Sequence, residues 1–199
     1  MKSDIILSGV GGQGILSIAT IIGEAALDEG LHIKQAEVHG MSQRGGDVQS
    51  NLRLSSDPIR SDLIPYGTAD LILSLEPMEA LRYLPYLSEK GWVVTHSVPF
   101  INIPNYPDPE KLIEELNRLP HVVLLDVEKL AKECGAPRSS NMVLLGAASD
   151  LLHIGIEKFE EGIRRVFGRK GQEIVEANIK ALRCGREAAK SIIDQKMKQ

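Results

Sequence analysis

The chain has 199 residues, of which 25% are charged and 4% aromatic, and its formal net charge is −4. This length suffices for a self-contained core of aliphatic side chains. The acidic balance and the scattered Lys and Arg residues argue against a surface for nucleic acid or an anionic membrane, which normally has a basic face. No apolar run reaches the length of a membrane span.

The N-terminal segment predicts a strand, a glycine turn and a helix in succession. A buried strand is expected over residues 4–8 and an amphipathic helix over 14–28. In this context the pattern G-x-G-x-x-G gives a tight backbone turn and a close approach of helix to sheet, and the helix N-terminus offers N–H groups to an anion. We therefore predict a cofactor-binding turn formed by Gly9, Gly11, Gly12, Gln13 and Gly14. A plain structural turn is the alternative.

The next segment predicts a β-hairpin with a polar, glycine-rich connection. Strands are expected over residues 33–38 and 48–54, and the alternation in the second is typical of a half-buried strand. Residues 39–47 form a loop in this interpretation. We assign cofactor binding to four residues of this loop, which supply amide groups, a guanidinium fork and backbone freedom: Ser42, Gln43, Arg44 and Gly45.

The two glycine-rich segments should converge at one edge of the sheet, beside its crevice. Arg44 could instead be an ordinary surface residue. If the glycine turn held a dinucleotide, Glu37 at the end of the second strand would bind the ribose hydroxyls.

The rest of the chain completes an α/β pattern and then becomes helical. Strands are expected over 71–73, 92–95 and 122–125, and helices over 77–84 and 108–119. The chain thus predicts a Rossmann-like, doubly wound, mostly parallel sheet with a β-hairpin insertion, over about residues 1–127. A helical C-terminal region follows over about 128–199, with helices near 141–152, 157–167 and 171–196. We expect one domain, with Asn141 capping the first of these three helices.

Catalytic and metal-binding residues are not predicted. The histidines lack ligand spacing, and Cys134 and Cys184 are too far apart in sequence for a zinc or iron–sulfur motif. With no secretion signal, we expect a cytoplasmic protein with reduced thiols buried as small hydrophobic groups.

The residues from Ser8 to Leu16 and from Glu37 to Gly46 together resemble the gamma-type subunit of 2-oxoacid:ferredoxin oxidoreductases. The similarity continues over residues 70–82 and 141–147. The stretch His-Gly-Met-Ser-Gln-Arg favours the indolepyruvate branch of this family, in which alanine is more frequent at the position of Ser42.

This resemblance implies a subunit of a larger enzyme. A large partner subunit would hold thiamine diphosphate and the iron–sulfur clusters, and ferredoxin would accept the electrons. The complex would oxidatively decarboxylate an aryl 2-oxoacid and transfer the acyl group to coenzyme A, while this chain binds no cofactor alone. This chain would pack against that partner, and the glycine turn and the Gln43–Arg44 loop would shape the coenzyme A side of the active-site cleft or the subunit contact beside it. Two alternatives remain: a free-standing NAD(P)- or FAD-binding Rossmann oxidoreductase, and a non-catalytic scaffold subunit.

Overall fold

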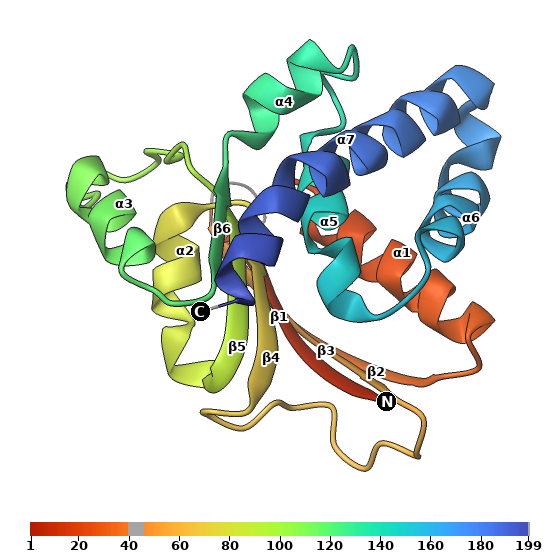
Figure 1. The fold of residues 1–199 in the computed structure, drawn as a ribbon, viewed down its shortest axis with the longest axis horizontal. Helices are drawn as coiled ribbons and strands as arrows, with labels where there is room; N and C mark the ends of the chain where they lie inside the picture. Colours follow the sequence, from red (N-terminus) through yellow and green to blue (C-terminus); the bar gives the residue numbers. More distant parts are fainter. Residues whose placement is uncertain (40–45, 199) are drawn as a thin grey trace.

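A computed structural model describes residues 1–39 and 46–198 of the chain. Within these ranges the strands form one six-stranded sheet in the order β2-β3-β1-β4-β5-β6 (Figure 1). The strands are β1 (Lys2–Val10), β2 (His32–His39), β3 (Asp47–Ser55), β4 (Ala69–Ser74), β5 (Leu87–His96) and β6 (Val122–Leu125).

The sheet is mostly parallel, with one antiparallel strand. β1, β4, β5 and β6 run parallel, whereas β3 pairs antiparallel with both β1 and β2. The predicted hairpin insertion is therefore confirmed as β2 and β3. The alternating pattern of β3 belongs to a half-buried strand, as predicted, and that strand lies between β2 and β1.

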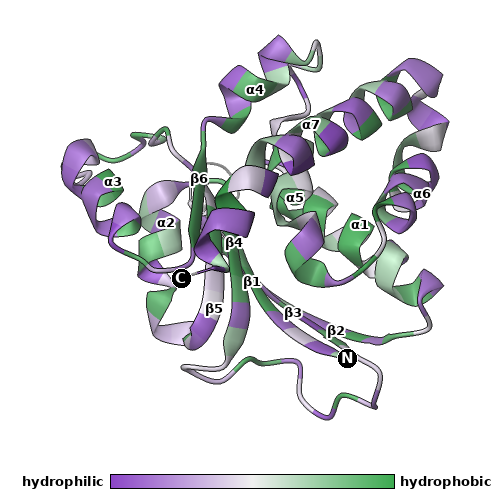
Figure 2. Ribbon diagram, in the orientation of Figure 1, coloured by the Kyte–Doolittle hydropathy of each residue, from purple (hydrophilic) through white to green (hydrophobic). Residues whose placement is uncertain are grey.

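Helices cover both faces of the sheet. The apolar side chains of β1 alternate between two cores: Ile5 and Leu7 belong to one and Ile6 to the other. α1, α5, α6 and α7 contribute to the first core, and α2 and α3 lie on the other face (Figure 1). The helices are α1 (Ile15–Asp28), α2 (Pro77–Arg82), α3 (Pro109–Asn117), α4 (Val127–Glu133), α5 (Ser140–Ala148), α6 (Ile156–Phe167) and α7 (Gln172–Lys196). Figure 2 shows hydrophobic residues concentrated in the central strands and in α5.

α5 is buried because it lies between the sheet and α7. All its residues from Met142 to Ala148 are buried, so it has no polar face. Gly146 and Gly185 bring the two helix backbones together: a Cβ on Gly146 would lie 1.9 Å from the Leu182 carbonyl oxygen, and one on Gly185 1.9 Å from that of Val143. The small residues of the last predicted helix therefore permit a close helix contact.

Most predicted elements are confirmed, with differences at their ends. The helix predicted over 77–84 ends at Arg82, and a 3-10 turn, Leu84–Tyr86, follows it around Pro85. The helix predicted over 141–152 changes at Ser149 into a 3-10 turn. β5 begins at Leu87, earlier than predicted, because Leu87 pairs with Ala69 of β4 before a register shift, and the polar residues between Leu87 and Trp92 show no apolar pattern.

The prediction for the cysteines is wrong. Cys134 and Cys184 are joined by a disulfide, with their Cα atoms 6.6 Å apart. Cys134 ends α4 and Cys184 lies in α7, and both residues are half-buried. The packing of α4 against α7 brings together two thiols that are separated by 50 positions in sequence.

No helix in the described part of the chain combines the length and apolarity that crossing a membrane requires.

Candidate functional site at the glycine turn

The glycine turn lies at the carboxyl end of β1, as predicted. Gly9 is still within β1, opposite Val48, and the turn itself uses Gly12 at φ 103° and Gly14 at φ 93°. These backbone conformations favour glycine because a Cβ would be strained there. The Gly11 N–H donates a hydrogen bond to the carbonyl of Gly46, at 2.8 Å.

Gln13 connects the turn to the neighbouring parallel strand. Its Oε1 accepts a hydrogen bond from the Val10 N–H at 2.7 Å, and its Nε2 donates to the Leu75 carbonyl at 3.2 Å. The Leu75 N–H in turn donates to the carbonyl of Ser8, at 3.0 Å. The side-chain amide of Gln13 therefore joins the ends of β1 and β4.

Asn141 has a different role from the predicted one. The N-cap of α5 is Ser139, and Asn141 Nδ2 donates to the Gly14 carbonyl oxygen at 3.4 Å. A Cβ on Gly14 would lie 2.6 Å from this nitrogen. The close approach at Gly14 therefore involves α5, and not the sheet as predicted.

A cavity of about 400 Å³ opens beside the turn, and it extends from the carboxyl ends of β1 and β4 past the end of β5 to Val127 and Glu128 of α4. α1 follows β1 onto one face of the sheet and α2 follows β4 onto the other, so this is the topological switch point at which open α/β sheets bind ligands. Of the predicted site residues, the cavity is lined by Gly12, Gln13 and Gly14, whereas Gly9 and Gly11 are not part of its lining.

The other predicted site residues, Ser42, Gln43, Arg44 and Gly45, lie outside the described residues. Their convergence with the glycine turn stays a prediction. The described residue that follows them, Gly46, accepts the hydrogen bond from Gly11.

Sequence reasoning missed much of the cavity wall. Arg138 and Ser140 reach it from the start of α5, and His96 and Phe100 from the end of β5 and the segment beyond. His96 is buried, with Nδ1 3.2 Å from the Leu125 carbonyl oxygen and 3.3 Å from the Val127 nitrogen. The polar run Arg-Ser-Ser-Asn before an apolar helix could have indicated a site. Because this run is far in sequence from the glycine turn, its contact with the turn could not be predicted.

The buried carboxylate of Glu76 positions one wall of this cavity. Glu76 caps α2 by accepting the Glu79 N–H at 2.9 Å. Its other oxygen accepts hydrogen bonds from the Tyr106 hydroxyl and from the Phe100 N–H, so it holds the segment that carries Phe100. Burial, and then the hydrogen bond to Glu76, raise the pKa of Tyr106.

Glu79 is a second buried carboxyl on α2. Burial raises the pKa of Glu79 above its ordinary value of 4.5, while the hydrogen bond from Arg82 opposes this shift. The Arg82 Nε lies 2.8 Å from Glu79 Oε2, and the Arg82 side chain is half exposed. The pair is on the α2 face of the sheet and does not line the cavity.

The sheet order places Glu37 away from the glycine turn. Glu37 lies on β2, and β3 intervenes between β2 and β1. β1 and β2 are therefore two strand spacings, or about 10 Å, apart. In a dinucleotide-binding Rossmann fold the corresponding two strands are neighbours. This topology disfavours a ribose-binding role for Glu37.

Comparison with known proteins agrees with this architecture. The model of the family "Pyruvate ferredoxin/flavodoxin oxidoreductase" matches residues 4–188. Indolepyruvate oxidoreductase subunit IorB of Archaeoglobus fulgidus is 37% identical over 194 residues, covering 93% of this chain and 94% of its own length. The subunit of the same name in Thermococcus kodakarensis is 39% identical, with 96% and 97% covered.

Solved structures show the same fold. The gamma subunit of a keto/oxoacid ferredoxin oxidoreductase from Geobacter sulfurreducens matches with a TM-score of 0.69 and 26% identity, over 95% of this chain and 99% of that chain. A 2-oxoglutarate:ferredoxin oxidoreductase from Magnetococcus marinus, with 2-oxoglutarate, coenzyme A and succinyl-CoA bound, matches with a TM-score of 0.75 and 25% identity. That match covers 96% of this chain and 31% of the longer one. The family model matches residues 4–188, and the similarity to the two IorB subunits extends over nearly the full length of both chains. This chain therefore belongs to the pyruvate ferredoxin/flavodoxin oxidoreductase family, and the relatives named above are subunits or chains of 2-oxoacid oxidoreductases.

Proposed function

We propose that this chain is the small subunit of a thiamine-diphosphate-dependent ferredoxin oxidoreductase for indolepyruvate or a related aryl pyruvate. The observation that carries the proposal is the similarity, over nearly the full length of both chains, to subunits named for indolepyruvate oxidation. The complex decarboxylates the 2-oxoacid, passes two electrons to ferredoxin and forms an acyl-CoA. We place it in the cytoplasm.

The redox cofactors belong to a larger partner subunit in this proposal. A four-cysteine iron–sulfur cluster needs four thiolates, whereas this chain has two cysteines, which are paired with each other. In the part of the chain that the structure describes, no group of three or more His, Cys, Asp or Glu residues could hold a metal. Thiamine diphosphate supplies the carbanion chemistry when bound to the partner.

The glycine cavity borders the coenzyme A side of the active-site cleft in this proposal. It borders the switch point of the sheet, and its wall contains one cationic side chain, Arg138, and one carboxylate, Glu128. The bound coenzyme A of the Magnetococcus relative supports a thiol-ester-forming reaction. The chain's own residues would bind and orient the anionic co-substrate, and Glu76 would act indirectly by holding the Phe100 wall.

The test is Arg44→Ala in the complex reconstituted with its large subunit. We expect a higher apparent KM for coenzyme A and little change in KM for the 2-oxoacid, because a guanidinium recognises phosphate groups. Arg60→Ala is the matched control, since Arg60 is exposed and outside the glycine cavity. An unchanged KM for coenzyme A in Arg44→Ala, or 2-oxoacid oxidation by this chain alone, would contradict the proposal.

A further inference from the structure

The connection between β5 and α3 is apolar and exposed. Residues 97–107 form this apolar segment, and none of them is charged. Four of its large hydrophobic side chains are between 37% and 65% exposed: Val98, Phe100, Ile101 and Ile103. No other stretch of six residues in the described parts of the chain exposes as many. Exposed hydrophobic side chains that are concentrated in one place mark interaction sites, whereas single ones do not.

Hydrogen bonds hold the apolar segment in one conformation. The buried carboxylate of Glu76 accepts hydrogen bonds from the Phe100 N–H at 3.3 Å and from the Tyr106 hydroxyl. At the start of the segment, the Ser97 N–H donates to the Leu125 carbonyl at 2.9 Å. The prolines of the segment add rigidity because each fixes its own φ. Side chains on a rigid segment lose less conformational entropy when a partner binds.

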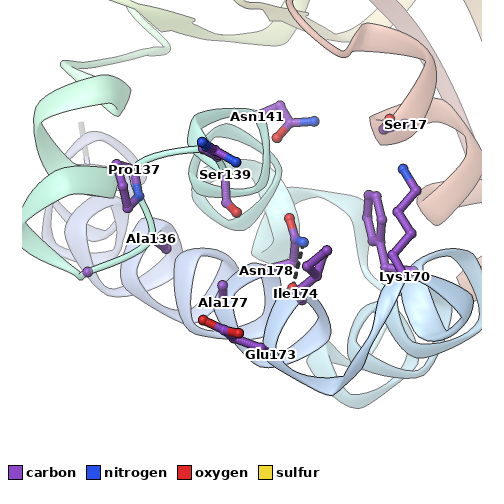
Figure 3. A pocket seen from close by; sticks show the side chains of 13 residues that line it. Ser17, Ala136, Pro137, Ser139, Asn141, Lys170, Glu173, Ile174, Ala177 and Asn178 are labelled. Carbon is purple, nitrogen blue, oxygen red and sulfur yellow. Dashed lines mark hydrogen bonds between the residues drawn. The ribbon is translucent and has the colours of Figure 1, made fainter.

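The apolar segment borders the glycine cavity, because Phe100 is part of the lining of that cavity. The same lining includes Arg138, which also belongs to a second cavity. This second cavity, of about 570 Å³, lies between the connection from α4 to α5 and the N-terminal half of α7 (Figure 3). The exposed residues Lys170 and Glu173 line it. Apolar and charged surfaces thus meet at the glycine cavity, and an apolar centre with a polar border is the usual composition of a protein–protein interface.

The size of the apolar segment favours a large partner over a second copy of this chain. Its four exposed side chains present at most about 400 Å² of apolar surface, half of what each partner contributes to a standard interface. Two copies that met through this segment alone would therefore not form a stable dimer. A partner that covers both the segment and the glycine cavity buries a larger area.

The comparison of chain lengths indicates which partner this is. In the Magnetococcus relative, the region that matches this chain is 31% of one longer chain, so it is covalently joined to the remainder of that chain. The two IorB subunits, in contrast, are matched over 94% and 97% of their own lengths. In an enzyme with such a small subunit, non-covalent contacts replace the covalent link. The small subunit therefore needs an exposed surface for the larger one.

We propose that the apolar segment docks onto the larger subunit of the oxidoreductase, at the mouth of the glycine cavity. Val98, Ile101 and Ile103 contact the larger subunit, since they do not line the glycine cavity. Glu76 is a positioning residue, which holds the segment through Phe100 and Tyr106. The inference rests on the function proposed above, because that function supplies the partner.

The affinity of the full chain for the purified larger subunit, measured by biolayer interferometry, tests the docking surface. Ile101→Ser should weaken binding by about tenfold, because the isoleucine side chain is then not buried on association. Leu63→Ser is the matched control and should leave the affinity unchanged. Leu63 is 58% exposed, against 65% for Ile101, and it lies between β3 and β4, at the amino ends of the parallel strands.

Tyr106→Phe tests the role of Glu76 separately. This variant removes the hydroxyl that donates to Glu76 and leaves all four exposed side chains in place. We expect about threefold weaker binding, because the loosened segment must be ordered on association. Hydrogen exchange of the Phe100 amide in the free chain should become faster. Unchanged affinity and unchanged exchange would together show that Glu76 does not position the segment.

The outcomes separate this inference from the proposed function. Circular dichroism verifies that each variant is folded. Equal affinities of the native chain and Ile101→Ser would overturn the inference and leave the proposed function intact, since the two subunits would still associate. A native chain that does not bind the larger subunit would overturn both. Sedimentation of the chain alone tests for another occupant: a dimer that Ile101→Ser dissociates would assign the segment to a second copy and overturn the inference.

Discussion

At the scale of single residues, two glycines of the turn have different physical roles. Gly12 and Gly14 both have positive φ. A Cβ on Gly12 would meet no atom within 4 Å, whereas one on Gly14 would meet Asn141. Gly12 therefore serves the backbone conformation alone, and Gly14 also permits the contact between the turn and α5.

Replacing each glycine by alanine separates these roles. Gly12→Ala should lower the free energy of unfolding by about 1–2 kcal/mol through backbone strain. Gly14→Ala should cost about 1 kcal/mol more, because Asn141 must move and lose its hydrogen bond. Urea unfolding of both variants measures the difference. Equal losses would show that the Asn141 contact contributes nothing to stability.

Glu79 predicts a pH dependence of stability. Because burial raises the pKa of the folded-state carboxyl, the folded state holds its proton more tightly than the unfolded state. Its contribution to the free energy of unfolding is therefore greatest below the ordinary pKa of 4.5 and is lost as pH rises above it. The stability of the native chain relative to Glu79→Gln should fall between about pH 4 and pH 7. A difference that is constant or increases over this range would contradict the assignment.

At the scale of elements, the contact between α5 and α7 determines where the site residues lie. Arg138 and Ser139, just before α5, and Asn141, in its first turn, line the cavities at this end of the helix. The rest of the helix is held by backbone-to-backbone contact at Gly146 and Gly185. The position of the polar residues therefore depends on two glycines more than a helical turn away.

Gly146→Ala should lower the free energy of unfolding by about 3 kcal/mol or more, because the new methyl group would overlap the Leu182 carbonyl, which cannot move independently of α7. Gly168→Ala is the control. Gly168 ends α6 with right-handed helical angles and has no atom within 4 Å of an added Cβ, so it should be neutral or slightly stabilising. Chemical denaturation of the two variants tests this, and similar stabilities would argue against the close crossing.

At the scale of the whole molecule, the C-terminal helices and the sheet share one hydrophobic core. That core includes Ile5 and Leu7 of β1 together with Leu182 and Ile193 of α7. The disulfide adds a covalent link between α4 and α7 within the helical part. A common hydrophobic core and a cross-link between residues 50 positions apart in sequence thus hold the chain together.

Removing the disulfide should destabilise the whole chain. For a loop of 50 residues, the chain-entropy estimate is about 4 kcal/mol. Unfolding of the oxidised chain should therefore shift to lower denaturant after reduction, whereas the double variant Cys134→Ser, Cys184→Ser should not respond to the reductant. A transition of the native chain that is insensitive to reductant would contradict a stabilising cross-link.

Local patterns in the sequence predicted the glycine turn, the hairpin and nearly every helix, because these depend on periodicity and on glycine and proline positions within a few residues. The family resemblance was also readable from two short motifs and is confirmed by the match over residues 4–188. Contacts between distant segments were not predictable in this way. Asn141 seemed suited to cap its own helix, and only the packing of α5 against the turn directs it to Gly14.

The sequence by itself determined the order of strands and helices and the place of the glycine turn after β1, since both are encoded in neighbouring residues. The tertiary structure decided the insertion of β3 between β1 and β2, the pairing of Cys134 with Cys184 and the assembly of both cavities around Arg138. Strand neighbours and helix contacts are chosen by the burial of apolar surface over the whole chain, which no local pattern records.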